Sequence, residues 1–288
     1  MAPEPGTPTL TFYDIEMRPP ISENACAPNP WKARQALNFK AVPYTTAWTD
    51  LPYITKTRTG LGIPAGRKFA DGTDFCTLPI LIDNKTGEKI GDSLDIAIYL
   101  DEKFPQAGKG KLFPEDDKEL AELLAGYTYK DTDMLVPLSG FSAVASQPRY
   151  APYASFNRHV DAAFTAHTLL MAYNMPFVTA TAERTKAEFA KRASMPSFDA
   201  FKVEGDVRKA IVASFEDGLA DLARLFARDT SGPFILGNTV CYADLIVGAW
   251  LRFASVCLPG EEWEALRGWH GGVFGRVFDE LGVFREVN

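Results

Sequence analysis

The amino-acid sequence predicts an α+β domain over residues 8–105, followed by an all-helical domain over residues 112–288. Three observations carry this prediction. Short apolar runs of strand length alternate with helical segments up to residue 105, and helical spacing dominates from residue 114 onward. Between them, residues 106–111 form a linker of small residues in which the pattern breaks. A length of 288 residues is also typical of about two domains.

The first half of the α+β domain contains two predicted strands and one helix. Residues 10–15 predict a strand, residues 31–39 a helix with Lys32 and Arg34 on its polar side, and residues 42–48 a second strand. The stretch that follows, up to Phe75, is long for a connection and contains several glycines. We expect it to be part helix and part functional loop.

A hairpin and a helix complete this domain. Residues 78–83 and 89–90 form the predicted strands, and Asn84-Lys85-Thr86-Gly87 between them is typical of a hairpin turn. A helix then begins at Asp92 and Ser93. The order strand, helix, strand, then two strands and a helix, is thioredoxin-like.

Helical spacing predicts only helices in the second domain. Two sets of apolar residues each share a helix face: Leu120, Leu123, Leu124 and Tyr127, and Val207, Ile211, Phe215, Leu219, Leu222 and Phe226. Residues 136–197 contain scattered prolines and at least one predicted helix, over residues 156–172.

Composition excludes several classes of function. A net charge of −7 and a pI near 5.1 disfavour nucleic-acid binding, which calls for a basic stripe. No run of about 18 apolar residues predicts a membrane span. Four cysteines and three histidines show no metal-binding spacing, so we expect no metal. A cytoplasmic protein is expected.

Two neighbouring segments, residues 77–81 and 91–100, predict a peptide-binding site. A cis Leu78-Pro79 bond would turn the backbone of Leu78 outward, where an extended peptide can pair with it. The helix start at Ser93 can hold a carboxylate, and Asp92 can meet an amine. The alternatives are a trans loop proline and an ordinary pair of helix-capping residues.

These segments resemble the glutathione transferase family, and in particular the fungal transferases related to bacterial β-etherases. Residues 234–244 add a second match, in which Cys241 stands where the family carries a capping Ser or Thr before Asp244. The resemblance implies the transferase fold, glutathione as a bound substrate, a homodimer and a hydrophobic aromatic acceptor. Lys68, together with Arg67, would then reach the glycyl carboxylate of glutathione, and the alternative is that both are solvated loop charges.

The residue that activates the glutathione sulfur is the open question. The resemblance implies a Ser or Cys seven residues before Arg34, but Ala27 occupies that position. Asn29 could donate its amide hydrogen to the sulfur, Cys26 could act as a thiolate, or Tyr13 could donate its hydroxyl. The remaining alternative is that no catalysis occurs.

Aromatic side chains supply the candidate acceptor pocket. Trp31, Tyr127 and Phe141 either line such a pocket or fill the core. The predicted activity is conjugation or cleavage of aromatic compounds or aryl ethers, as in detoxification of xenobiotic or wood-derived molecules. The alternatives are a non-catalytic carrier of aromatic or polyphenolic ligands, of the ligandin type, and a regulatory or assembly module.

Overall fold

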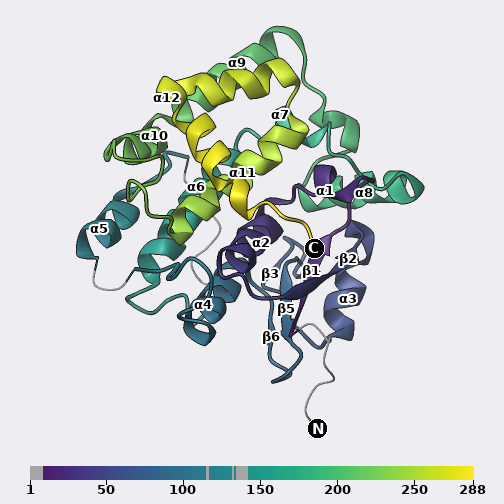
Figure 1. Cartoon of the computed structure of the whole chain (residues 1–288). Helices are drawn as coiled ribbons and strands as arrows, with labels where there is room; N and C mark the ends of the chain where they lie inside the picture. Colours follow the sequence, from purple (N-terminus) through teal and green to yellow (C-terminus); the bar gives the residue numbers. More distant parts are fainter. Residues whose placement is uncertain (1–8, 115–116, 132, 134–141) are drawn as a thin grey trace.

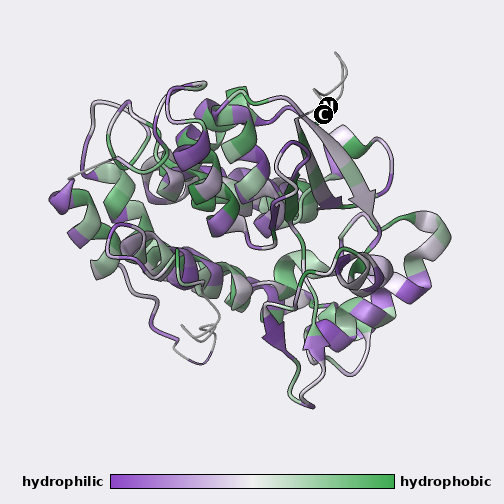
Figure 2. Cartoon of the chain, turned by 90° about the horizontal axis from the view of Figure 1, so that it is seen from below, coloured by the Kyte–Doolittle hydropathy of each residue, from purple (hydrophilic) through white to green (hydrophobic). Residues whose placement is uncertain are grey.

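The computed structural model describes residues 9–114, 117–131, 133 and 142–288. A small sheet flanked by helices forms one part of the molecule, and helices form the rest (Figure 1). Both hydrophobic and hydrophilic residues occur on most helices (Figure 2), as expected for amphipathic helices that pack around a shared core. None of the helices in these ranges is long and apolar enough to cross a lipid bilayer.

The sheet has the strand order β2-β1-β5-β6. Its strands are β1 (Leu10–Ile15), β2 (Tyr44–Thr49), β5 (Ile80–Asp83) and β6 (Lys89–Ile90). β1 pairs with β2 in parallel and with β5 antiparallel. A parallel pair needs a crossover, which the helix α2 (Pro28–Phe39) provides. With the helix α4 (Ser93–Lys103) after the hairpin, the predicted thioredoxin-like arrangement is confirmed.

The long stretch between β2 and β5 is partly helical, as predicted. It contains the 3-10 turn η1 (Leu51–Tyr53), the helix α3 (Ile54–Gly60) and a two-stranded ribbon of β3 (Arg67–Lys68) and β4 (Asp74–Phe75). The ribbon was not predicted, because strands of two residues leave no periodic signal. A short helix, α1 (Ile21–Asn24), also precedes α2.

The second part of the chain is helical within the described residues, apart from two isolated bridges between residues 234 and 239. Its longer helices are α5 (Lys118–Gly126), α6 (Ala151–Thr165), α8 (Ala182–Arg192), α9 (Gly205–Gly218), α10 (Ala220–Ala227), α11 (Tyr242–Cys257) and α12 (Gly260–Glu280). Its short helical segments are α7 (Leu169–Ala172), η4 (Thr179–Thr181), η5 (Phe198–Phe201) and η6 (Leu281–Phe284). The predicted fold class, a thioredoxin-like domain followed by an all-helical domain, is confirmed.

Two helix boundaries differ from the sequence prediction. The helix predicted over residues 156–172 starts at Ala151 and breaks after Thr165, so α6 and α7 are separate. The apolar face predicted from Val207 to Phe226 also divides, because the chain turns at Leu219 between α9 and α10. Val207, in the first turn of α9, is 62% exposed and does not join the core.

Helix α12 bends sharply near its middle. Trp269 leaves the helical backbone, and His270, Gly271 and Gly272 all take positive φ angles, of 51°, 75° and 77°. Glycine adopts this left-handed backbone without steric cost, so the paired glycines permit the bend. The second arm of α12 then returns toward α11 and α2 (Figure 1).

Helix α2 is buried together with its charged side chains. Lys32, Arg34 and Lys40 are all 0% exposed, so the polar side predicted for Lys32 and Arg34 is buried. Arg34 Nη2 donates to Asp14 Oδ2 at 2.8 Å, and Lys40 Nζ donates to Asp101 Oδ1 at 3.0 Å. Helical periodicity cannot distinguish an exposed charge from a buried ion pair.

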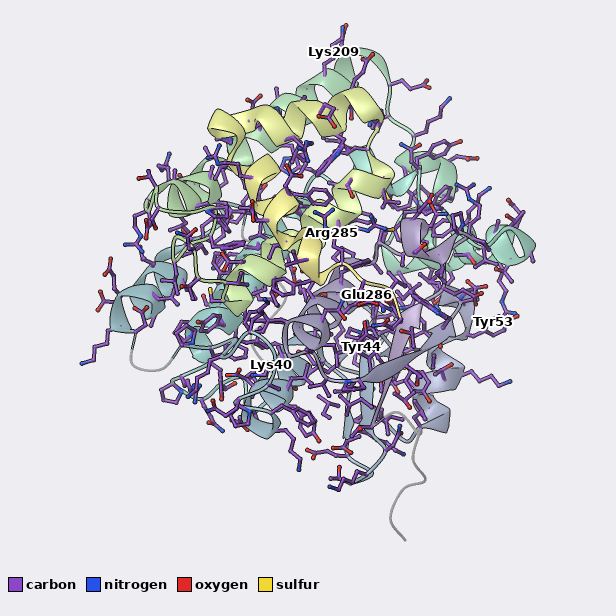
Figure 3. All side chains as sticks on the ribbon, viewed as in Figure 1. Lys40, Tyr44, Tyr53, Lys209, Arg285 and Glu286 are labelled. Carbon is purple, nitrogen blue, oxygen red and sulfur yellow. The ribbon has the colours of Figure 1, made fainter. Side chains whose placement is uncertain are left out.

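The C-terminal segment crosses α2. It carries Arg285 and Glu286, which Figure 3 labels above Lys40 in this view. Asn38 Nδ2 donates to the carbonyl oxygens of Phe284 and Glu286 at 2.8 and 2.9 Å. The last residues of the chain therefore pack against the thioredoxin-like domain.

Asp244 fixes the start of the buried helix α11. Its two carboxylate oxygens accept from the backbone of Ile235 at 3.0 Å and from the backbone of Cys241 at 2.7 Å. Cys241 is the N-cap residue and completes a capping box with Asp244. Burial raises the pKa of Asp244 to about 6.

We expect Cys241→Ser to raise the free energy of unfolding by about 0.5–2 kcal/mol, because a hydroxyl accepts a hydrogen bond better than a thiol. Urea denaturation measures this change. Cys257→Ser, in an equally buried thiol at the other end of α11, is the matched control and should bring no gain. An unchanged or lower stability for Cys241→Ser would contradict the capping role.

Candidate functional site

A cleft of about 440 Å³ lies between the two domains. One wall comes from the thioredoxin-like domain and includes Leu78, Pro79, Asp92 and Ser93. The opposite wall is the side of α6 that carries residues 157, 158 and 161. The two segments that predicted a peptide-binding site therefore meet in one cavity.

The Leu78-Pro79 bond is cis, as predicted from the sequence. This turn immediately precedes β5, and both residues line the cleft. Leu78 itself is 3% exposed, so its side chain packs inward while its backbone borders the cavity. The turn can therefore offer backbone groups to an extended ligand.

Arg58 ties this turn to the start of α4. Its guanidinium donates from Nη1 to the carbonyls of Thr77 at 2.7 Å and Gly91 at 3.0 Å, and from Nε to that of Pro64 at 2.8 Å. A Cβ on Gly91 would lie 2.5 Å from Arg58 Nη2, so the close approach requires glycine. Desolvation lowers the pKa of Arg58, and the nearby Asp92 charge opposes this. Sequence reasoning missed Arg58.

Asp92 and Ser93 begin α4. Asp92 is the N-cap, and its Oδ1 accepts from the backbone of Leu94 at 2.8 Å and of Asp95 at 3.3 Å. Asp92 thus caps the helix, as the alternative interpretation predicted, and it also lines the cleft. Ser93 is 4% exposed and lines the cavity.

Asn29 lies in the first turn of α2 and borders the cleft. Its Oδ1 accepts from Lys32 Nζ at 2.9 Å. An ammonium group only donates, so the atom of Asn29 that faces Lys32 must be the oxygen. The Asn29 amide nitrogen, which has no partner in the described ranges, is then the group available to a ligand.

Lys32 also connects α2 to the opposite wall. Its Nζ donates to Asp161 Oδ1 at 2.5 Å, and Trp250 Nε1 donates to the same oxygen at 2.6 Å. Lys32 is fully buried and Asp161 is 22% exposed. This network fixes Asn29, α6 and α11 relative to one another.

Asp95 and Ser142 form a second polar contact at the cleft. Ser142 Oγ donates to Asp95 Oδ1 at 2.5 Å. Burial raises the pKa of Asp95 to about 6, the Ser142 hydroxyl acts against that rise, and the Asp92 charge adds to it.

Several predicted site residues lie elsewhere. Cys26 is 1% exposed, with its Sγ 3.9 Å from Cys257 Sγ. Trp31 is 0% exposed, and its Nε1 donates to the Ala25 carbonyl at 2.7 Å. Neither lines the cleft. Adjacency in sequence did not reveal that these side chains point into the core.

The other predicted residues also lie outside the lining of the cleft. Tyr127 packs against Phe156 in the core, 5.3 Å between ring centroids. Lys68 is exposed and pairs with Asp74, while its neighbour Arg67 lines the cavity instead. Tyr13 is half-buried and packs against the cluster that includes Leu51, Ile54 and Ile80. Phe141 lies outside the described residues.

The described part of the chain holds no group of three or more His, Cys, Asp or Glu side chains placed to bind a metal ion.

Comparison with known proteins assigns the family. The model of the glutathione S-transferase N-terminal domain matches residues 27–103, and that of the C-terminal domain matches residues 154–284. The chain belongs to the glutathione S-transferase family. Both matched regions contribute to the cleft, the first through residues 29, 78 and 93 and the second through α6.

One similar protein comes from a fungus. The glutathione S-transferase-like protein ustS of Aspergillus flavus is 29% identical over 139 residues, which are 44% of this chain and 48% of that protein. The match thus spans about half the length of this curated relative.

Solved structures share the fold over nearly the whole chain. A glutathione S-transferase of Ceriporiopsis subvermispora, CsGST63524, in complex with glutathione, has a TM-score of 0.73, covers 97% of this chain and 99% of its own, and is 23% identical. GSTFuA3 from Phanerochaete chrysosporium also has a TM-score of 0.73. The match covers 98% of this chain and 99% of GSTFuA3, at 22% identity. The resemblance to fungal transferases inferred from the sequence is confirmed.

We expect Arg58→Met to lower the free energy of unfolding by about 2–4 kcal/mol, because buried carbonyl oxygens at the cleft lose a charged donor. Urea denaturation measures the loss. Arg224→Met, in an exposed arginine of α10, is the control and should change stability by about 0.5 kcal/mol or less. Equal effects of the two substitutions would contradict the role of Arg58.

The raised pKa of Asp95 predicts a pH-dependent stability. Burial disfavours the charged form in the folded protein, so the contribution of Asp95 is complete below its unfolded pKa of about 4. It is lost as pH rises through the folded pKa of about 6. The difference in unfolding free energy between wild type and Asp95→Asn should therefore fall over that interval. A difference that is constant with pH would contradict the shift.

Proposed function

We propose that this protein binds glutathione in the cleft and joins it through its sulfur to an aromatic electrophile, including the carbon of an aryl ether. The observation that carries the proposal is the convergence of the cis Leu78-Pro79 turn, the start of α4 and Asn29 on one cavity. Membership of the glutathione S-transferase family supports it. So does the glutathione complex of the Ceriporiopsis protein, which shares the fold.

The proposed pose follows from the polar groups of the cleft. The cysteinyl backbone of glutathione pairs with the backbone of Leu78, and the γ-glutamyl carboxylate meets the amide and hydroxyl of Ser93 at the start of α4. Asp92 faces the γ-glutamyl amine. Arg67, which lines the cavity next to the predicted Lys68, is the better placed cation for the glycyl carboxylate.

Asn29 is the proposed activator of the sulfur. Its amide nitrogen donates to the thiolate, and Lys32, which donates to the Asn29 oxygen, keeps that nitrogen available to the ligand. The thiol proton leaves to solvent, and the thiolate forms a carbon–sulfur bond while the leaving group departs with its electron pair. Cys26 is the second candidate, although its side chain lies against Cys257.

A carrier of aromatic or polyphenolic ligands, of the ligandin type, is the alternative function. The observation that favours it is Ala27, which is 6% exposed and offers neither a hydroxyl nor a thiol where the family resemblance implies one. Such a carrier would bind glutathione without turnover. For the transferase proposed above, we further expect a homodimer and a role in detoxification.

Glutathione binding and turnover of an aryl halide test the proposal together. We expect Ser93→Ala to weaken glutathione binding about tenfold in calorimetry, through loss of a hydrogen bond to a charged group. We expect Asn29→Ala to lower kcat about 100-fold, since it removes a donor to the developing thiolate. The ultraviolet absorbance of the bound thiolate should then appear at higher pH.

The controls separate the alternatives. Asn238→Ala, in an exposed loop away from the cleft, should leave both readouts unchanged. A loss of turnover in Cys26→Ala rather than Asn29→Ala would assign activation to the second candidate. Binding without turnover in the wild type would favour the carrier, and absence of glutathione binding would defeat both.

A further inference from the structure

The lining of the cleft carries four cationic side chains, Arg58, Arg67, Lys89 and Arg158, and three carboxylates, Asp92, Asp95 and Asp161. Within the described ranges none of the four cations forms an ion pair, while Asp161 pairs with Lys32 and Asp92 caps α4. Most charged contacts elsewhere pair a cation with a carboxylate, and the chain as a whole carries a net charge of −7. Unpaired cations in a cavity of an acidic protein indicate an anionic ligand.

Three of these cations lie on the wall formed by the thioredoxin-like domain, along which glutathione is proposed to bind. Arg58 is occupied by backbone carbonyls, Lys89 Nζ donates to the Leu61 carbonyl at 2.8 Å, and Arg67 stacks on Phe75, 4.1 Å from the ring centroid. Of the four, Arg158 alone comes from the helical domain, on α6. Glutathione bound along the first wall would leave the Arg158 charge without a partner.

The neighbouring Asn157 is also unsatisfied. Its side chain is 7% exposed and lines the cleft, yet its Oδ1 has no hydrogen-bond partner among the described residues. The Nε of Arg158 is buried and equally without a partner. Buried polar atoms are normally hydrogen-bonded, and these two border a cleft, so they are available to polar groups of a ligand.

This polar wall lies beside the proposed reaction centre. Asp161 is three and four positions after Arg158 and Asn157 on α6, so all three side chains share one face of the helix. Asp161 contacts Lys32, and Lys32 contacts Asn29. A ligand held at Arg158 is therefore within about one helical turn, ~5 Å, of the Lys32–Asn29 network.

We propose that the acceptor is an aromatic acid, held by its carboxylate at Arg158 and by a second polar group at Asn157. This proposal rests on the function proposed above and adds the chemical class of the second substrate. Trp31 and Tyr127, two of the residues predicted for an aromatic pocket, lie in the core. Asp161 does not repel the acid, since Lys32 and Trp250 donate to it.

Kinetics with a chloronitrobenzoate and its methyl ester test the proposal. In both compounds a carbon–sulfur bond forms, the carbon–chlorine bond breaks, chloride leaves with the electron pair and the thiol proton passes to solvent. The readout is the ratio of kcat/KM for the acid to that for the ester, each corrected for its uncatalysed rate. We expect this ratio to exceed one in the wild type and to fall about tenfold or more in Arg158→Gln.

Control variants keep the test specific. Arg224→Gln removes an exposed arginine on α10 and should leave the ratio unchanged. Arg158→Lys retains the charge and should recover part of the preference, which an unfolded or distorted variant would not do. A ratio that does not respond to Arg158→Gln, or a wild type that prefers the ester, would overturn the proposal.

Direct binding separates this proposal from the function on which it rests. If glutathione binds but neither compound is turned over, the transferase function fails. Calorimetry of nitrobenzoate on the glutathione-loaded protein then still tests the acid site. Binding that Arg158→Gln weakens about tenfold supports it, and equal binding of nitrobenzoate and its methyl ester overturns it.

Discussion

The structure depends on the neutralisation of three cations that α2 carries into the interior. Lys32, Arg34 and Lys40 are fully buried, and a buried charge is tolerable only when it is paired and hydrogen-bonded. The partners are Asp161 of α6, Asp14 of β1 and Asp101 of α4. Since these carboxylates come from three elements and both domains, the ion pairs fix how the sheet, α4 and the helical domain surround α2.

The same constraint forms the proposed reaction centre. Lys32 has to be paired with Asp161, and that pairing brings the polar face of α6 against the start of α2, where Asn29 lies. The cleft is the space that remains between this contact and the Leu78-Pro79 turn. Stability and function thus share one network, and the second wall of the site follows from a requirement of folding.

The sequence predicted those parts of the site whose signal is local. A proline in a strand start and an acidic residue before Ser93 are enough to indicate the turn and the helix start, and both lie in the cleft. Arg58 could not be predicted, because its partners are backbone carbonyls that leave no mark in the sequence. Arg158 and Asn157 were missed because helical spacing puts them on one face with Asp161 but does not show that this face borders the cleft.

The atoms of α6 that lack a hydrogen-bond partner also affect which substitutions this fold can accept during evolution. Asn157 Oδ1 and Arg158 Nε support no contact within the described protein, so replacing either residue removes no internal hydrogen bond at those atoms. Asp161, one turn later, is held by Lys32 and Trp250 and is not free to vary in this way. A gene duplicate could therefore acquire a new second substrate by substitutions at residues 157 and 158, while it inherits the glutathione wall and the folded scaffold intact.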